Sequence, residues 1–270
     1  MTREERIMKR LQEHYDYIEA KGFNIVFLAL QGSQNYRLDI YNDDYMSDID
    51  TKAVILPSFE DFVHQKPGYS NTLILSNNEH IDVKDIRVMF ECFKKQNINF
   101  LEILFTEFKI INPKYKELIQ PLFDNAEQIA HLNTNQAIRC MAGMSMEKLK
   151  ALQHPYPATI EKIEKFGYDP KQLHHILRMN DFIKQYATGL PFKKCLISER
   201  TLYLIEIKKG ILSEEEAVKL AVETDTDTKN FKDIIITERD NVDDKAIDIL
   251  TQIKFNILSK SIKEEILKKF

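Results

Sequence analysis

The chain has 270 residues, of which 43% are hydrophobic and 30% are charged, as is usual for one large globular domain or two ordinary ones. Its formal net charge is −4, so no overall basic field attracts nucleic acid, and such a partner would need a local patch. No apolar run approaches the ~20 residues of a membrane-spanning helix, and the charged N-terminus lacks the apolar core of a signal peptide. We therefore expect a cytoplasmic protein that does not act in a membrane.

The three cysteines, Cys92, Cys140 and Cys195, lie far apart in the chain. Their odd number and wide spacing argue against a disulfide framework and against a zinc site. We expect buried, reduced thiols.

The chain begins with alternating helix and strand signals. Apolar residues at helical spacing over 3–21 end at a glycine, and the apolar run 25–30 predicts a strand. A polar loop separates this run from a second predicted strand over 48–56. Ser58 is then placed to cap a short helix over 59–63.

A predicted hairpin and two helices follow. The segments 72–76 and 79–86 have strand character and are joined by an Asn-Asn turn. The period becomes helical over 85–95, where Asp85 can act as the cap, and 97–108 predicts another helix. These elements complete a small sheet with helices beside it.

The character of the chain changes at about Asn112. Helical periods dominate the rest, over 113–132, 135–152, 170–189, 198–210, 213–225 and 242–270. We expect an α+β protein with a small mixed sheet and flanking helices in residues 1–112, followed by an α-helical domain in residues 113–270.

Two carboxylates stand out at the second predicted strand. Asp48, Asp50 and Lys52 share one strand face because successive side chains alternate. Magnesium prefers hard carboxylate oxygens together with substrate phosphates, and two such aspartates can bridge a pair of ions if a third carboxylate is near. The alternative is a pair of surface residues on an edge strand, although charges in a core-bound strand are costly unless they are paired.

The third carboxylate is expected on a later strand. Asp82 fits because its neighbours Ile81 and Val83 face the core. Glu79 and Asp85 are the alternatives, and Asp85 ranks lower because it points the other way and can cap a helix.

Gly32 and Ser33 follow the first strand directly. Glycine lets the backbone approach a phosphate closely, and a helix that begins there presents free N–H groups. The sequence therefore predicts a phosphate-binding turn beside the carboxylates.

The motif GSQNY at 32–36, followed by SDID at 47–50, resembles the polymerase β-like nucleotidyltransferase superfamily. It is most similar to the bacterial and phage branch of predicted nucleotidyltransferases, whose motif is GSxxYGL followed by SD(I/Y)D. The resemblance continues through Asp82 to the segment 167–178 and leaves the C-terminal third largely unmatched. Arg37 stands where this family often has glycine.

The resemblance implies a reaction and roles for the matched residues. Asp48 and Asp50 would hold two Mg²⁺ ions, with Mn²⁺ as an alternative metal, and Asp82 would complete one metal site and help deprotonate an acceptor hydroxyl. Gly32 and Ser33 would hold the triphosphate of a nucleoside triphosphate donor. The acceptor hydroxyl would attack the α-phosphate in line and release pyrophosphate. Lys52 is a further candidate phosphate contact or a surface lysine.

A basic stripe is predicted on the helix over 170–189. Lys171, His175 and Arg178 are spaced by four and three residues, so they share one helical face. The stripe can grip donor phosphates or an acceptor, or it is a solvated face with a partly buried His175. Tyr36 can stack on a base, but a core position that holds the turn is the favoured interpretation.

Two other classes of function compete with the transferase. Asp82-Val83-Lys84, with Asp48 or Asp50, mimics the carboxylates and lysine of metal-dependent restriction-type nucleases. A non-catalytic nucleotide-binding or antitoxin-like module would bind without turnover. The sequence leaves open whether the acceptor is a small molecule, a protein or an RNA end, and it does not define the preferred base or the oligomeric state.

Overall fold

The computed structural model describes residues 1–41, 46–157, 159–236 and 242–269. Contacts divide the chain into two compact units, the first built from Met1–Asn35, Ser47–Leu132 and Asp243–Phe270, the second from Tyr36–Met46 and Asn133–Val242. The predicted α+β class is confirmed. The sequence suggests one boundary at Asn112. The contacts instead assign residues 113–132 and 243–270 to the first unit, and the segment Tyr36–Met46 to the second.

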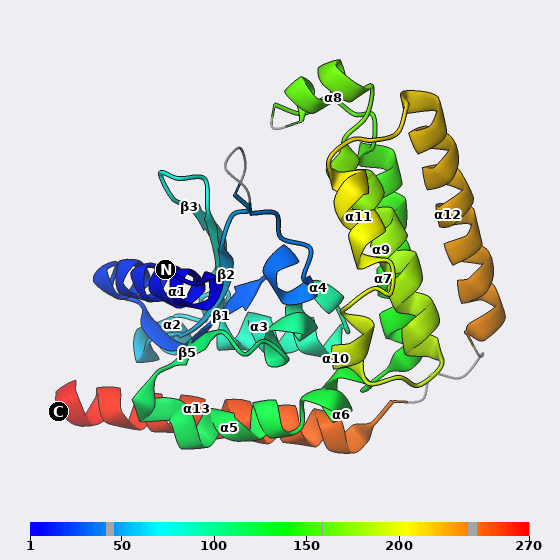
Figure 1. Cartoon of the computed structure of the whole chain (residues 1–270). Helices are drawn as coiled ribbons and strands as arrows, with labels where there is room; N and C mark the ends of the chain where they lie inside the picture. The colour runs from blue at the N-terminus through cyan, green and yellow to red at the C-terminus, as the bar shows by residue number, and fades with distance from the viewer. Residues whose placement is uncertain (42–45, 158, 237–241, 270) are drawn as a thin grey trace. The chain divides into compact units, whose positions relative to one another are not determined.

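The first unit contains a five-stranded mixed sheet (Figure 1). Its strands are β1 (Asn24–Gln31), β2 (Asp50–Leu56), β3 (Ser70–Ile74), β4 (His80–Asp85) and β5 (Lys109–Ile111), in the order β3-β4-β2-β1-β5. The β2–β4 pair is parallel, and the other three pairs are antiparallel. The expected β3–β4 hairpin is present, while the short edge strand β5 was not predicted.

Helix α1 (Arg3–Ala20) packs on one face of the sheet. Its fully buried residues Ile7, Leu11 and Ile18 join one core cluster with sheet residues such as Ala53 and Val83. The spacing of these apolar residues gives the helix one buried stripe, as the sequence predicted. A capping box formed by its N-cap threonine and the glutamate three residues later fixes its start.

Helices cover the opposite face. Helix α3 (Ile86–Lys94) contacts β2 and β4 and begins at Asp85, whose carboxylate accepts a hydrogen bond from the Arg87 N–H at 2.8 Å. The predicted helix over 97–108 is shorter than expected: α4 (Ile98–Leu101) continues into the 3-10 turn Glu102–Leu104, after which the chain extends toward β5.

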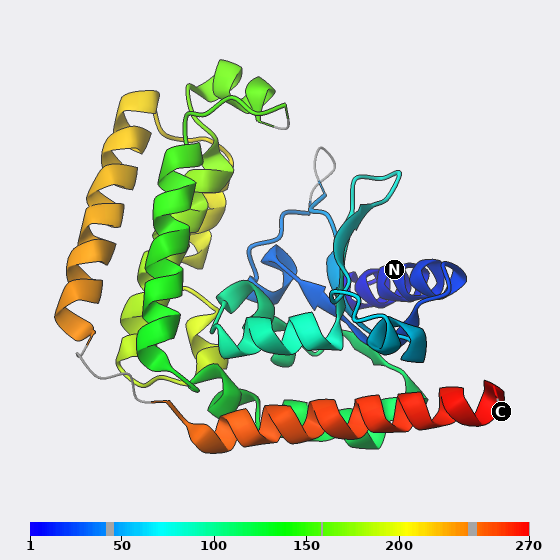
Figure 2. The same ribbon diagram turned by 180° about the vertical axis from the view of Figure 1, so that it is seen from behind.

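The remaining helices of the first unit come from separate parts of the chain. They are α2 (Phe59–Val63), which Ser58 caps as predicted, the 3-10 turn Pro113–Tyr115, α5 (Lys116–Asp124), α6 (Ala126–Ala130) and α13 (Asp244–Lys269). Helix α13 packs along α5 and also contacts α3 (Figure 2). The Asn24 amide at the start of β1 donates to the Ser261 hydroxyl at 3.3 Å, which ties α13 to the sheet.

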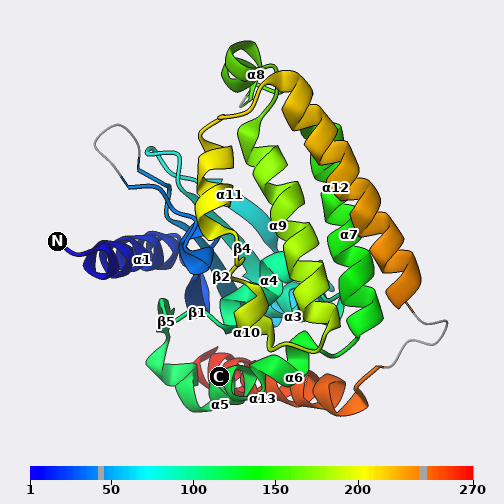
Figure 3. The same ribbon diagram turned by 45° about the vertical axis from the view of Figure 1, so that its right-hand side comes forward.

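The second unit is helical. Its helices are α7 (Thr134–Ala151), α8 (Ile160–Phe166), α9 (Pro170–Ala187), α10 (Phe192–Cys195), α11 (Thr201–Lys208) and α12 (Glu214–Ile235). The largely buried α9 contacts α7, α10, α11 and α12 (Figure 3). Among the described residues, no helix is both long enough and apolar enough to cross a bilayer.

The three cysteines are free thiols, and of the three only Cys195 is buried as the sequence predicts. Cys92 and Cys140 are half-buried, and burial raises the pKa of Cys92 and Cys140 above that of a free thiol.

Candidate functional site

A row of charged side chains crosses the sheet face opposite α1. In the parallel β2–β4 pair, Lys52 lies directly opposite Asp82. Because side chains alternate, Asp50 shares the face of Lys52, and Lys84 shares the face of Asp82. The other side chains of β2 and β4 face α1, as Thr51 shows by its 2.9 Å contact with the ring of His14. This carboxylate face (Asp50, Lys52, Asp82 and Lys84) lies wholly within the first unit.

Asp82 is bracketed by two ammonium groups. Lys52 Nζ donates to its Oδ2 at 2.9 Å, and Lys84 Nζ lies 3.1 Å from its Oδ1. Both lysines also lie over the Phe100 ring, at 4.3 and 5.3 Å from its centroid. Burial lowers the pKa of Lys52, and the neighbouring Asp82 charge opposes that change. Lys52, only 4% exposed, is therefore a buried partner of Asp82 and not a surface lysine.

Asp50 and Asp48 differ in their surroundings. Asp50, half-buried, is the first residue of β2, and its Oδ1 accepts the His80 backbone N–H at 2.8 Å, with His80 Nδ1 3.3 Å away. Asp48 is exposed and precedes the strand, so the expected strand face begins at Asp50 and does not include Asp48. The buried Ile49 lies between them.

Glu79, one alternative third carboxylate, belongs to a buried network instead. Its Oε2 accepts from Arg10 Nε at 2.9 Å and lies 3.0 Å from His14 Nε2, while Oε1 accepts the Ile49 N–H at 3.3 Å. Burial alone would raise the pKa of Glu79, but the hydrogen bonds from His14, Arg10 and Asn77 lower it to about 2. Glu79 thus holds the backbone between Asp48 and Asp50, a role that no local pattern in the sequence indicates.

The Gly-Ser turn lies beside this row. Gln31 pairs with Asp50, so Gly32 follows β1 immediately next to the start of β2. Gly32 has a φ of 86°, a left-handed conformation that favours glycine, and Ser33 begins a 3-10 turn. The Gly32 N–H donates to Glu102 Oε1 at 2.9 Å. In this structure the Gly32 amide, which the sequence predicts to face a phosphate, is therefore bonded to the buried Glu102 carboxylate, and no local pattern in the sequence indicates this contact.

The carboxylate face fits a hard divalent cation in its donor chemistry. Within the described residues, no three His, Cys, Asp or Glu side chains converge as a ready-made metal centre. Asp82 Oδ1 is nevertheless buried and accepts no hydrogen bond from any described residue; Lys84 forms an ion pair with this oxygen, and Lys52 bonds the other one. Oxygen atoms of this kind suit magnesium, and the two lysines now balance the charge that a cation would otherwise balance.

The three residues of the predicted basic stripe on α9 have different surroundings within the second unit. Lys171 is exposed at the first turn of the helix, whereas His175 is half-buried. Burial, followed by the charge of His174, lowers the pKa of His175 well below its usual value. Arg178 is only 3% exposed, so the three residues do not form one solvated face.

Tyr36 is a core residue, in line with the favoured interpretation. It is 3% exposed, and the Arg178 guanidinium carbon lies 3.9 Å from its ring centroid. The next residue, Arg37, has a φ of 58°. This left-handed backbone is a conformation that glycine adopts more readily than arginine.

Comparison with known proteins adds no assignment: no family model matches the chain, and no curated protein gives a significant match.

Proposed function

We propose that the first unit is the catalytic part of a magnesium-dependent nucleotidyltransferase. It would move a nucleoside monophosphate from a nucleoside triphosphate to an acceptor hydroxyl and release pyrophosphate. The observation that carries the proposal is that Asp50 and Asp82 share one face of neighbouring strands, with Gly32 directly after Gln31, the partner of Asp50.

The chemistry follows from these groups. The acceptor oxygen forms a bond to the α-phosphorus, the bond from that phosphorus to the α–β bridging oxygen breaks, and pyrophosphate leaves. The hydroxyl proton passes to the Asp82 carboxylate, whose Oδ1 accepts no hydrogen bond from a described residue. Lys52 and Lys84, which pair with Asp82, would offer positive charge to phosphate oxygens at the same face.

The carboxylates of Asp48, Asp50 and Asp82 would hold the metal. Bound magnesium supplies positive charge that activates the attacking oxygen and stabilises the leaving one. The Glu79 network would act indirectly by fixing the backbone N–H of Ile49, between the two aspartates.

The test is pyrophosphate release from each of the four nucleoside triphosphates, with magnesium and a lysate as the source of acceptors. The Asp48→Asn/Asp50→Asn variant keeps the side-chain shape, and we expect it to lose at least about 100-fold in rate. The matched control is Asp16→Asn/Glu19→Gln, which removes two exposed charges from α1 and should retain the wild-type rate. Equal circular dichroism spectra would show that both variants are folded.

Three outcomes contradict the proposal. If the Asp48→Asn/Asp50→Asn variant is as active as the control, the carboxylate face is not the catalytic centre. If the wild-type protein cleaves plasmid or RNA without using nucleotide, and Asp82→Asn abolishes the cleavage, the restriction-type nuclease is the correct assignment. Nucleotide binding without turnover would instead favour the non-catalytic module.

A further inference from the structure

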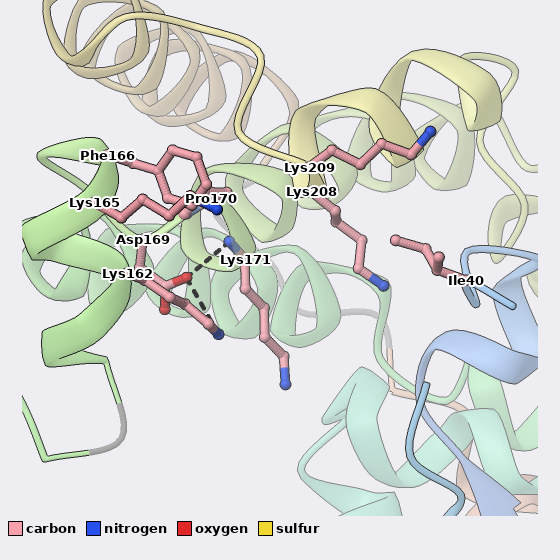
Figure 4. A pocket seen from close by; sticks show the side chains of 9 residues that line it. All are labelled: Ile40, Lys162, Lys165, Phe166, Asp169, Pro170, Lys171, Lys208 and Lys209. Atoms are coloured by element: carbon pink, nitrogen blue, oxygen red, sulfur yellow. Dashed lines mark hydrogen bonds and ion pairs between the residues drawn. The ribbon is translucent and has the colours of Figure 1, made fainter. Parts of the chain in front are cut away.

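A cavity of about 370 Å³ lies within the second unit and is lined mainly by lysines (Figure 4). Among the described residues that line it are Lys162, Lys165, Lys171, Lys208 and Lys209, and the carboxylate among them is Asp169. Ile40, Phe166 and Pro170 supply an apolar wall. We call this cavity the lysine pocket.

Three helices bring these lysines together. Lys162 and Lys165 are three residues apart on α8, so they lie on one side of that helix. Lys171 comes from the first turn of α9, and Lys208 is the last residue of α11. In Figure 4 the side chains of Lys162, Lys171 and Lys208 extend toward a common space.

The carboxylate in the lining does not balance these charges. Asp169 is 1% exposed and caps α9, accepting the Lys171 N–H at 2.9 Å. Of the lysines, Lys162 contacts it, at 3.8 Å, and Lys209 pairs with Glu206 at 2.6 Å. The Lys171 ammonium forms no ion pair with any described residue.

Lys208 shows the effect of this crowding. The residue is half-buried, and its ammonium donates to the Leu38 carbonyl at 2.7 Å. Burial and the charge of Lys171 lower the pKa of Lys208 to about 8, and Lys162 and Arg178 act in the same direction, while Asp39 opposes them. The pocket therefore holds positive charges that repel one another, an arrangement that an anion would stabilise.

The size and charge of the pocket indicate the class of anion. Ligand pockets begin at roughly 300 Å³, so the cavity has room for more than a single phosphate. One phosphate carries at most two negative charges at neutral pH, too few for ammonium groups presented by three helices. We propose that the lysine pocket binds a ligand that carries two or more linked phosphates, either an inorganic polyphosphate or the polyphosphate tail of a nucleotide.

A small ligand suits the site better than a nucleic-acid strand. The lysines gather around one partly open pocket of about 370 Å³, whereas a strand is followed along its backbone by a groove or an extended basic stripe. The net charge of −4 also gives no overall attraction to a long polyanion. The inference needs no catalysis at the carboxylate face and goes beyond the proposed function.

The test is calorimetric titration of the full chain with inorganic tripolyphosphate in the presence of EDTA, which removes metal-dependent binding at the carboxylate face. We expect the Lys162→Gln/Lys171→Gln variant to bind at least about tenfold more weakly, because two charge-assisted contacts are lost. The matched control is Lys184→Gln/Lys194→Gln, which removes two exposed lysines outside the pocket and should bind within about twofold of wild type. Both changed pocket lysines are exposed, so folding should be retained.

Further ligands separate the two sources of linked phosphates. ATP that binds more tightly than tripolyphosphate would identify a nucleotide ligand, and equal affinities would identify the phosphate chain alone; either result supports the proposal. AMP and orthophosphate should each bind at least about tenfold more weakly than tripolyphosphate.

The proposal is overturned if the pocket and control variants bind tripolyphosphate equally, or if orthophosphate binds as tightly. It is also overturned if a single-stranded RNA binds in a lysine-dependent way and tripolyphosphate does not. The Asp48→Asn/Asp50→Asn variant should bind tripolyphosphate like wild type, so failure of the proposed transferase and failure of the lysine pocket give different results.

Discussion

Replacing Glu79 by glutamine tests how the first unit holds its carboxylates in place. Glu79 is 7% exposed and interacts with Arg10, His14 and the N–H of Ile49. Glutamine keeps the size of the side chain but removes its charge, so the ion pair with Arg10 is lost. The N–H of Ile49 can still be satisfied by the amide oxygen, although the amide NH₂ then faces other donors.

The magnitude follows from the pKa of Glu79. A value of about 2, against the usual 4.5, corresponds to about 3 kcal/mol of stability at neutral pH. Because the Arg10 side chain is 26% exposed and water can solvate it, we expect Glu79→Gln to cost about 2 kcal/mol. The folded-state pKa lies below the unfolded one, so this stability is fully present above about pH 4.5 and is lost as the pH falls toward 2.

The assay is urea unfolding of wild type and Glu79→Gln at pH 7, 5 and 3. The difference in free energy of unfolding should be nearly the same at pH 7 and 5 and should fall by more than half at pH 3. A difference that does not change with pH would refute the role given to the Glu79 charge. The control, Glu19→Gln on the exposed surface of α1, should change stability by less than about 0.5 kcal/mol.

Three further predictions concern single positions. Lys52→Met should lower the free energy of unfolding by about 2 kcal/mol in urea titrations, because Asp82 then keeps only Lys84 as its partner. The double variant Lys52→Met/Asp82→Asn should recover part of this loss, and a double variant less stable than Lys52→Met would contradict the prediction. Arg37→Gly should leave the melting temperature unchanged or raise it, whereas Arg37→Val should lower stability by about 1–2 kcal/mol, because the φ of 58° disfavours a β-branched residue. Equal melting temperatures for the glycine and valine variants would count against this backbone conformation. As the pH rises through about 8, wild type should lose affinity for tripolyphosphate relative to Lys208→Arg, because lysine loses its proton and arginine does not. If calorimetry gives parallel pH profiles for the two proteins, Lys208 does not contact the ligand.

Local patterns in the sequence were sufficient to predict most strands of the sheet and the capping residues of the helices beside it. The apolar runs became β1 and β2, and Ser58 and Asp85 cap α2 and α3 as their positions predicted. The edge strand β5 escaped prediction because three half-buried residues carry too little pattern to separate a strand from the end of a helix.

Long-range contacts account for what the sequence could not show. Glu79 looked like a candidate ligand because its partners Arg10 and His14 lie more than sixty residues earlier in the chain. Arg178 looked solvent-exposed because its contact with Tyr36 joins a loop to a distant helix.

The lysine pocket and the division into units have the same origin. Lys162 and Lys208 belong to separate helices, so no single helical face reveals that they converge. Likewise, the apolar stripe of α13 predicts that the helix packs, but it does not say that the partner is α5 in the first unit.

The central claim, transfer of a nucleoside monophosphate, is tested most directly by the fate of the phosphates. The full chain is incubated with magnesium and lysate-derived acceptors, and with a nucleoside triphosphate labelled at either the α- or the γ-phosphate. We predict that the α label becomes attached to an acceptor and the γ label appears in pyrophosphate, and that Asp48→Asn/Asp50→Asn abolishes both. Transfer of the γ label to an acceptor, or α-label transfer that persists in this folded variant, would contradict the account.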